Sequence, residues 1–171
     1  MTINQKLHTL GMSVENGELE VTFSDGDAAA FVPLQLHFHS PSEHTVDGKH
    51  YDLEMHIVHK YKDSGNLGAV VGVFFDTIHG GPKENQFIAD IAPEFAHSNN
   101  LDGYYKVSHD VRFAKFLQSV DFRDFYQYDG SLTTPPCSEG IKWLVIKDVQ
   151  TLSPQQLEEF QKLWEDNSAY A

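Results

Sequence analysis

Three histidines in the first third of the chain have the residue type and spacing of a metal site. His37 and His39 are two residues apart in the segment QLHFH, and His56 follows in the segment DLEMHIVH. Side chains at i and i+2 point to the same face of a β-strand, so His37 and His39 share a face to which a neighbouring strand can add His56. Three imidazoles are the ligand number of a catalytic zinc site, whose fourth position stays open for water. The spacing therefore predicts a Zn²⁺ site.

Polar residues accompany the three histidines at the same spacing. Gln35 lies two residues before His37, and Glu54 lies two residues before His56. A metal-bound imidazole usually donates its other ring N–H to a carboxylate or amide oxygen, which fixes its direction. Gln35 and Glu54 are therefore expected to orient the ligands, and Glu43, in the connector, is expected to join a polar network beside the metal.

The segments that must hold these residues are mainly extended. Alternating or continuous apolar patterns predict strands at residues 18–23, 31–38, 51–59, 67–75 and 142–146. The continuous run at 67–75 is typical of a strand buried on both faces in the middle of a sheet. The segments 31–38 and 51–59 are expected to be antiparallel neighbours, with a hairpin turn at 46–49 between them.

The sequence predicts only a few short helices. Ser153, Pro154 and Gln156 form a capping box with proline at the first helical position, which predicts a helix start. Residues 85–95 predict a short helix, and the pattern at 111–117 fits a strand or a helical turn. The segment YDGSLTTPP at 128–136 predicts a loop.

Composition favours one globular domain. The 171 residues are 40% apolar and include 12 phenylalanines, enough for a substantial core. The net charge of −13 argues against nucleic acid and anionic membranes as partners. No run approaches the ~18 apolar residues of a membrane span, and the first residues lack the apolar core of a signal peptide.

The motifs HFHSPSEHTVDGKHYDLEMHIVH and GSLTTPP, in this order, closely resemble those of the α-class carbonic anhydrases. The resemblance extends from about Gly11 to the segment near Trp164. It implies a single, mainly β domain over residues 1–171, with a few short helices and a central, largely antiparallel twisted sheet that carries the zinc. It also implies a sulfonamide-sensitive lyase that reversibly hydrates carbon dioxide to bicarbonate.

The resemblance also assigns roles to individual residues. It implies that His37, His39 and His56 bind zinc, and that Thr133 and Glu43 orient a zinc hydroxide nucleophile. Thr134 is implied to place bicarbonate through its hydroxyl. The apolar wall for carbon dioxide would consist of Val58, Val70, Leu132 and Trp143.

The sequence departs from the family pattern in several places. Asn16-Gly17-Glu18 puts Glu18 where fast members carry a histidine proton shuttle, and His8 is a second candidate. Both ends are shorter than is usual in the family, so segments at both termini are expected to be lacking. Cys137 resembles one half of a disulfide of secreted members, which favours a secreted or organelle-lumen location. A homodimer is one assembly open to the chain.

Two other interpretations remain open at this stage. Related domains that have lost zinc histidines act in binding or as scaffolds, and such a catalytically weak or inactive domain is the main alternative. The spacing of Glu43 after His39 also resembles the first cupin motif, which would make Glu43 a metal ligand. No matching second cupin motif follows in the sequence.

Overall fold

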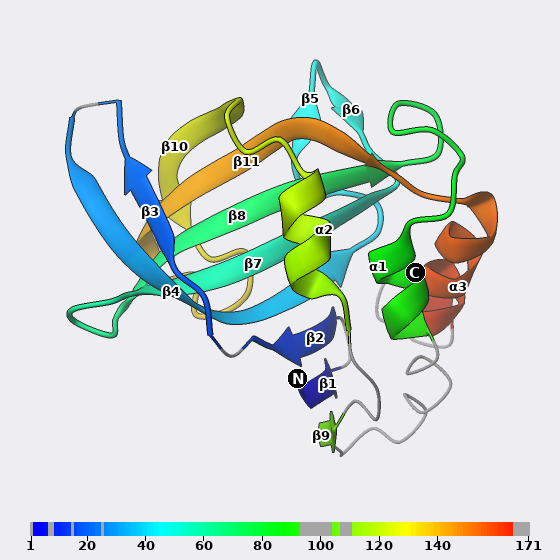
Figure 1. Ribbon diagram of the computed structural model, residues 1–171, viewed down its shortest axis with the longest axis horizontal. Coiled ribbons are helices and arrows are strands. Elements are labelled where there is room, and N and C mark those ends of the chain that lie inside the picture. The colour runs from blue at the N-terminus through cyan, green and yellow to red at the C-terminus, as the bar shows by residue number, and fades with distance from the viewer. Residues whose placement is uncertain are drawn as a thin grey trace.

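The computed structural model describes residues 2–6, 9–14, 16–24, 26–92, 104–106 and 111–165. The main element is one curved, nine-stranded sheet, against which the helices pack (Figure 1). The strands of this sheet are β1 (Thr2–Lys6), β2 (Thr9–Ser13), β3 (Leu19–Thr22), β4 (Ala28–His39), β7 (Leu53–Tyr61), β8 (Leu67–Asp76), β9 (Tyr104–Lys106), β10 (Phe125–Ser131) and β11 (Glu139–Thr151). The short strands β5 (Thr45–Val46) and β6 (Lys49–His50) form a separate hairpin.

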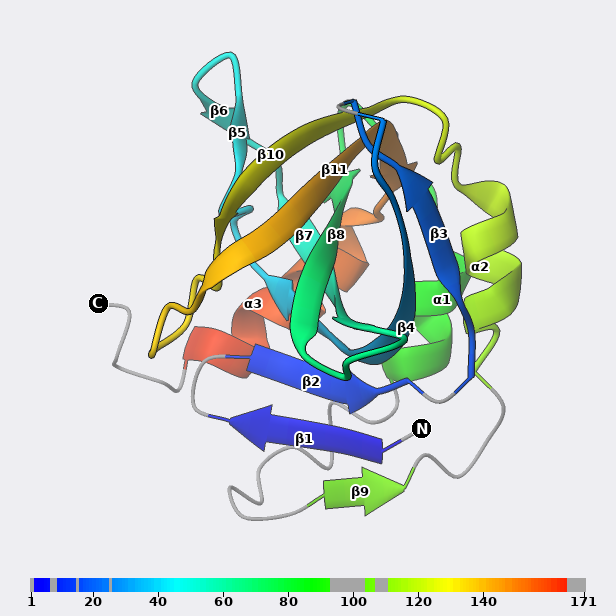
Figure 2. The same cartoon turned by 90° about the vertical axis from the view of Figure 1, so that its left-hand side faces the viewer.

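The strand order is β10-β11-β8-β7-β4-β2-β1-β9, and β3 also pairs with β4. Figure 2 shows β2, β1 and β9 crossing the lower end of the sheet. All these pairs are antiparallel except β11 and β8, which run parallel. The mainly β fold with a mixed, largely antiparallel central sheet is therefore confirmed.

The two faces of the sheet carry different apolar clusters. One face packs against the helices α1 (Gln86–Ile91), α2 (Phe113–Ser119) and α3 (Pro154–Glu165). Aromatic contacts join them, because Phe116 of α2 stacks on Phe75 of β8, and Phe160 of α3 lies 5.0 Å from Phe38 of β4 between ring centroids. The other face carries a smaller cluster, which we call the site-face cluster. It consists of Val58, Val70, Phe74, Ile141, Trp143 and Val145.

Most elements agree with the sequence predictions. The five predicted strands are present, and β8 is buried along nearly its whole length between β11 and β7. Asp47 and Gly48 form the predicted hairpin turn, both with positive φ. The segment at 111–117 resolves as helix α2, since Phe116 packs into the core.

Two parts of the chain differ from the predictions. The sequence predicts a loop over residues 128–136, but in the structure the strand β10 continues to Ser131 and the loop begins only after it. Tyr128 lies opposite Trp143 of β11, and their rings stack at 6.0 Å with an angle of 3°. This pairing outweighs the turn tendency of Asp129-Gly130. The strands β1 and β2 were not predicted, since their polar residues show little alternation.

No helix among the described residues is long and apolar enough to cross a membrane.

The start of α3 is fixed by buried hydrogen bonds. The side chain of Gln156 accepts from the backbone N–H groups of Asn85 and Ser153 at 2.9 and 3.2 Å, and donates to the carbonyl of Asn85 at 2.8 Å. The hydroxyl of Ser153 accepts from the N–H of Gln156, which completes the predicted capping box. The Asn85 side chain in turn caps α1, so a single glutamine joins two helix starts.

We expect Gln156→Ala to lower the free energy of unfolding by about 2–3 kcal/mol, because it leaves both backbone groups of Asn85 buried without these bonds. Urea unfolding measures the difference. Gln155→Ala is the matched control, since Gln155 is exposed on the same helical turn, and it should change stability little. Equal effects of the two substitutions would contradict this role of Gln156.

Candidate metal centre

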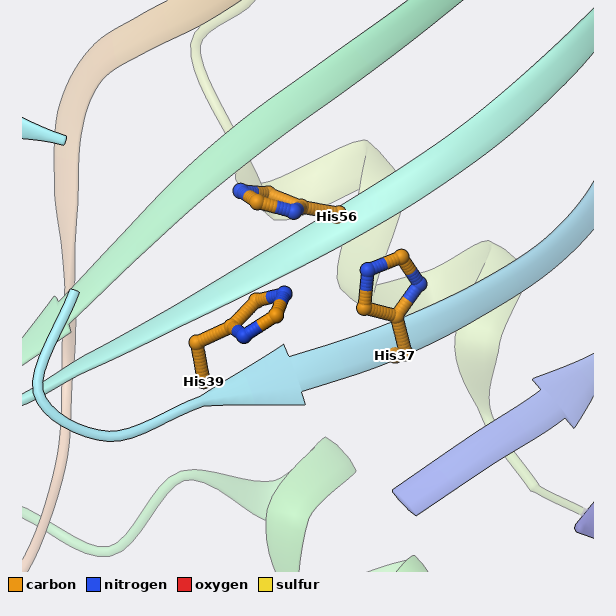
Figure 3. Close-up of side chains that lie close together, drawn as sticks. All are labelled: His37, His39 and His56. Carbon is orange, nitrogen blue, oxygen red and sulfur yellow. The ribbon is translucent and has the colours of Figure 1, made fainter. Parts of the chain in front are cut away.

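The pairing of β4 with β7 brings the three histidines together. His37 lies directly opposite His56, and His39 lies opposite Glu54. The ring centroids are 4.9 Å apart for His37 and His39, 5.2 Å for His37 and His56, and 4.7 Å for His39 and His56. Figure 3 shows the three rings converging, two from β4 and one from β7. One nitrogen from each ring lies within 4.8 Å of the others, so the predicted cluster is present.

The partners of the rings indicate which nitrogens face the centre. Nδ1 of His37 lies 3.0 Å from Oε1 of Gln35, and Nδ1 of His39 lies 3.5 Å from a carboxylate oxygen of Glu43. Nε2 of His56 lies 2.9 Å from Oε1 of Glu54, outside hydrogen-bond alignment. The remaining nitrogens are Nε2 of His37, Nε2 of His39 and Nδ1 of His56.

This arrangement fits a zinc ion. Nε2 of His39 is buried and has no hydrogen-bond partner among the described residues, which is costly unless a cation or water satisfies it. Three imidazole nitrogens with oxygen acceptors behind the rings are the donor set of a catalytic zinc site.

Burial keeps the rings of His37 and His39 neutral, as metal binding would require. It lowers the pKa of His37 to about 2, and the neighbouring His56 and His39 lower it further. Burial and the neighbouring His56 likewise lower the pKa of His39 to about 3. Both lone pairs are therefore available to a cation at neutral pH.

Glu54 lies behind His56 and joins it to two residues that the sequence analysis did not assign to the site. Oε1 of Glu54 lies 2.6 Å from Nδ1 of His44, and Oε2 accepts from the His44 backbone N–H at 2.9 Å. The other ring nitrogen of His44 lies 2.6 Å from the hydroxyl of Tyr128. Burial of Glu54 alone would raise its pKa, but the contacts with His44 and His56 hold that pKa well below its usual range.

His44, Glu54 and His56 also bring three possible donor atoms together, but their spacing is that of hydrogen bonds. Two ligands of a tetrahedral zinc ion are roughly 3.3 Å apart. The closest contacts of Glu54 are 2.6 and 2.9 Å. These residues therefore form a network that orients His56, and they do not form a second metal site.

An apolar cavity of about 120 Å³ opens beside the histidines. Every residue expected to bind substrate borders it, together with two leucines, Leu34 and Leu67, that the sequence analysis did not single out. The lining residues are Leu34, Gln35, His37, His56, Val58, Leu67, Val70, Leu132, Thr133, Thr134 and Trp143.

The model of the eukaryotic-type carbonic anhydrase family matches residues 1–170. The chain belongs to this family. A carbonic anhydrase of Klebsiella pneumoniae is 34% identical over 94% of this chain and 60% of its own length. A carbonic anhydrase of Nostoc sp. is 40% identical over 81% of this chain and 49% of its own length. The chain thus spans about half to three fifths of these carbonic anhydrases.

Solved carbonic anhydrase structures share the fold. The α-carbonic anhydrase of Photobacterium profundum has 35% identity and a TM-score of 0.77, over 97% of this chain and 70% of the other. The enzyme of Thermovibrio ammonificans, solved with the inhibitor sulfanilamide, has 36% identity and a TM-score of 0.74, over 96% of this chain and 66% of the other. Dioscorin DB3S of Dioscorea polystachya is a further relative, 37% identical over 75% of this chain and 45% of its own length.

Two residue assignments taken from the carbonic anhydrase resemblance are only partly assembled. Glu43 lies beside the cluster, with its second oxygen 3.9 Å from Nδ1 of His56. Thr133 borders the cavity and is exposed. Within the described residues no hydrogen bond joins Thr133 to Glu43, so the expected pair is not formed in this arrangement.

The expected proton shuttle is also not at the site. Glu18 precedes β3, whose first residue, Leu19, lies opposite Phe31. Phe31 is six residues before His37 on β4, roughly 20 Å along the strand. The carboxylate of Glu18 is instead paired with Lys62 at 2.6 Å. His8 lies outside the described residues, and Cys137 is an exposed free thiol.

The buried histidines should make the zinc-free protein sensitive to acid. His59, on the opposite face of β7, also has its pKa lowered to about 4 by burial. In the unfolded chain each histidine gains a proton below its ordinary pKa of 6.5, whereas His37, His39 and His59 stay neutral in the folded chain until about pH 4 or lower. Unfolding therefore takes up protons in this window, and stability falls as the pH falls.

We expect the free energy of unfolding of zinc-free protein to decrease by about 4 kcal/mol per pH unit between these pKa values, since each histidine contributes about 1.4 kcal/mol. Urea unfolding at a series of pH values measures the slope. His59→Leu should reduce the slope by about one third while leaving the metal ligands intact. A slope near zero in this window would show that the folded protein protonates these rings freely.

Proposed function

We propose that the chain binds Zn²⁺ through His37, His39 and His56 and catalyses the reversible hydration of carbon dioxide to bicarbonate. The observation that carries this proposal is the convergence of three imidazoles beside a small apolar cavity. Zinc bound there supplies Lewis acidity, which brings the pKa of a coordinated water near 7, as is known for carbonic anhydrase.

The size of the cavity supports a small substrate. About 120 Å³ is well below the roughly 300–1,000 Å³ that is typical of pockets for larger ligands. Val58, Val70 and Trp143 present apolar surface there and are almost fully buried. Such a wall can hold a neutral triatomic molecule next to the metal without a charged anchor, and it offers nothing to a phosphate or a sugar.

The chain's own residues have two kinds of task in this proposal. Gln35 and Glu54 hold the imidazoles of His37 and His56 in position through the contacts at 3.0 and 2.9 Å. Thr133 and Glu43 select and orient the nucleophilic oxygen, which requires the Thr133 hydroxyl to move into contact with Glu43. Thr134, on the same loop, donates to the bicarbonate oxygens.

A second candidate is a binding domain with little or no catalysis. The separation of Thr133 from Glu43 favours it, and dioscorins are among the relatives. One solved dioscorin is described as complexed with ascorbate, with 26% identity and a TM-score of 0.75. Zinc binding without carbon dioxide hydration would support this candidate.

We expect Thr133→Ala and Glu43→Gln to lower the hydration rate by on the order of a hundredfold while one zinc per chain is retained, because both act on the nucleophile and not on the metal. Stopped-flow hydration with a pH indicator, combined with metal analysis, gives both quantities. Thr45→Ala, an exposed threonine of β5, should change neither. His39→Ala should remove both.

Two results would contradict these assignments. Release of zinc by Glu43→Gln would make Glu43 a ligand. Wild-type protein that holds one zinc per chain, does not hydrate carbon dioxide and is unaffected by a sulfonamide would exclude the enzyme and leave the binding domain.

Proton export should be slow, because Glu18 is paired with Lys62 away from the histidines. We expect the hydration rate to rise several-fold as an imidazole-type buffer is added, since the buffer replaces the missing relay. Glu18→Ala should leave this dependence unchanged. A rate independent of buffer, or one that falls on Glu18→Ala, would contradict the expectation.

A further inference from the structure

Gly72 occupies an unusual place in the middle of β8. Its neighbour on β7 is His56, and its neighbour on β11 is Val145. It does not have a positive φ, so the backbone does not require glycine here. The surrounding residues, Val70, Val71 and Val73, are β-branched, as strand preference favours. A glycine inside such a strand often marks a place that another group approaches closely.

The group that approaches Gly72 is the carboxylate of Glu54. A Cβ at position 72 would lie 2.9 Å from Oε1 of Glu54, closer than real Cβ contacts. The next nearest atoms are the methyl groups of Val145 at 3.7 and 3.8 Å, which are ordinary contacts. The carboxylate therefore takes up the space that a side chain at position 72 would need.

The Oε1 atom of Glu54 that lies against position 72 is also the atom that orients the ring of His56. Oε1 of Glu54 lies 2.9 Å from Nε2 of His56 and 2.6 Å from Nδ1 of His44. Oε2 is held by the backbone N–H of His44. Glu54 is 0% exposed, so its carboxylate is held by these contacts and not by solvent. A methyl group at position 72 must displace the oxygen that fixes the His56 ring.

We propose that Gly72 is a positioning residue of the metal centre. Its missing side chain leaves room for Glu54 at the place from which one carboxylate oxygen reaches both His44 and His56. Gly72 touches neither metal nor substrate, and it acts on the ion through Glu54 and then His56. This inference rests on the proposed zinc site but not on carbon dioxide hydration.

The test measures zinc affinity of the whole chain by competition with a chelator. We expect Gly72→Ala to weaken zinc binding by about 10–100-fold, the usual effect of disturbing a residue that orients a metal-bound histidine. The absorption bands of the cobalt-substituted protein should shift as well, because they report ligand geometry. Val71→Ala is the matched control. Val71 directly precedes Gly72 in β8 and is buried on the opposite face, so its truncation should lower the melting temperature without changing affinity or spectrum.

A double substitution identifies Glu54 as the intermediary. Glu54→Asp shortens the side chain by one methylene and withdraws the carboxylate from position 72. Adding Gly72→Ala to Glu54→Asp should therefore cost much less zinc affinity than adding it to the wild type. Equal costs in both backgrounds would overturn the inference. So would an unchanged affinity and cobalt spectrum in Gly72→Ala.

The double variant also tests the inference in the case that Gly72→Ala does not fold. If Gly72→Ala alone fails to fold, the double variant should fold and bind zinc, because the shortened side chain removes the close contact. Failure of the double variant as well would show that the methyl group is excluded by something other than Glu54. Wild-type protein that does not bind zinc would reject the proposed function instead.

Discussion

The antiparallel register between β4 and β7 is the constraint on which the site depends. It places His37 opposite His56 and His39 opposite Glu54. Because side chains alternate along a strand, a slip of one residue would turn His56 and Glu54 to the helix-packed face and leave His37 and His39 without a third ligand. The register is held from both sides. Met55 and Ile57, which alternate with the site residues, are buried in the helix-packed core.

This alternation lets one strand pair serve two environments. On one face, Phe38, Met55 and Phe75 form a dry core with the helices. On the other, polar rings and a fully buried carboxylate lie within the site-face cluster, where unsatisfied groups would be costly. Most of these polar groups have partners, because Glu54 contacts both His44 and His56, and the Tyr128 hydroxyl lies within hydrogen-bond distance of His44. Nε2 of His56 lies near Glu54 without an aligned hydrogen bond, and Nε2 of His39 has no hydrogen-bond partner among the described residues, so a cation offers His39 the missing interaction.

Much of the fold and of the candidate site could be predicted from the sequence, because these features depend on residues close together in the chain. The spacing of His37, His39, Gln35 and Glu54 follows from the two-residue period of a strand, and the start of α3 follows from its capping box. The missed features depend on contacts between distant segments. Tyr128 is a strand residue because it stacks on Trp143, and His44 joins the site because its ring reaches Glu54 and Tyr128. Glu18 was placed by motif alone, and the strand register puts it elsewhere.

The role proposed for Gly72 depends on contacts between neighbouring strands and not on its place in the sequence pattern. The apolar pattern of LGAVVGVFF does not explain the glycine at position 72, since strand preference alone favours a β-branched residue there. The position of the Glu54 carboxylate explains it, because a side chain at position 72 would collide with that carboxylate. The support behind His56 therefore extends over two adjacent strands and the connector after β4. His44, in the connector after β4, and His56 of β7 contact the carboxylate, and Gly72 of β8 leaves room for it. The pairing of β7 with β8 thus matters to the site as directly as the pairing of β4 with β7, although β8 contributes no ligand.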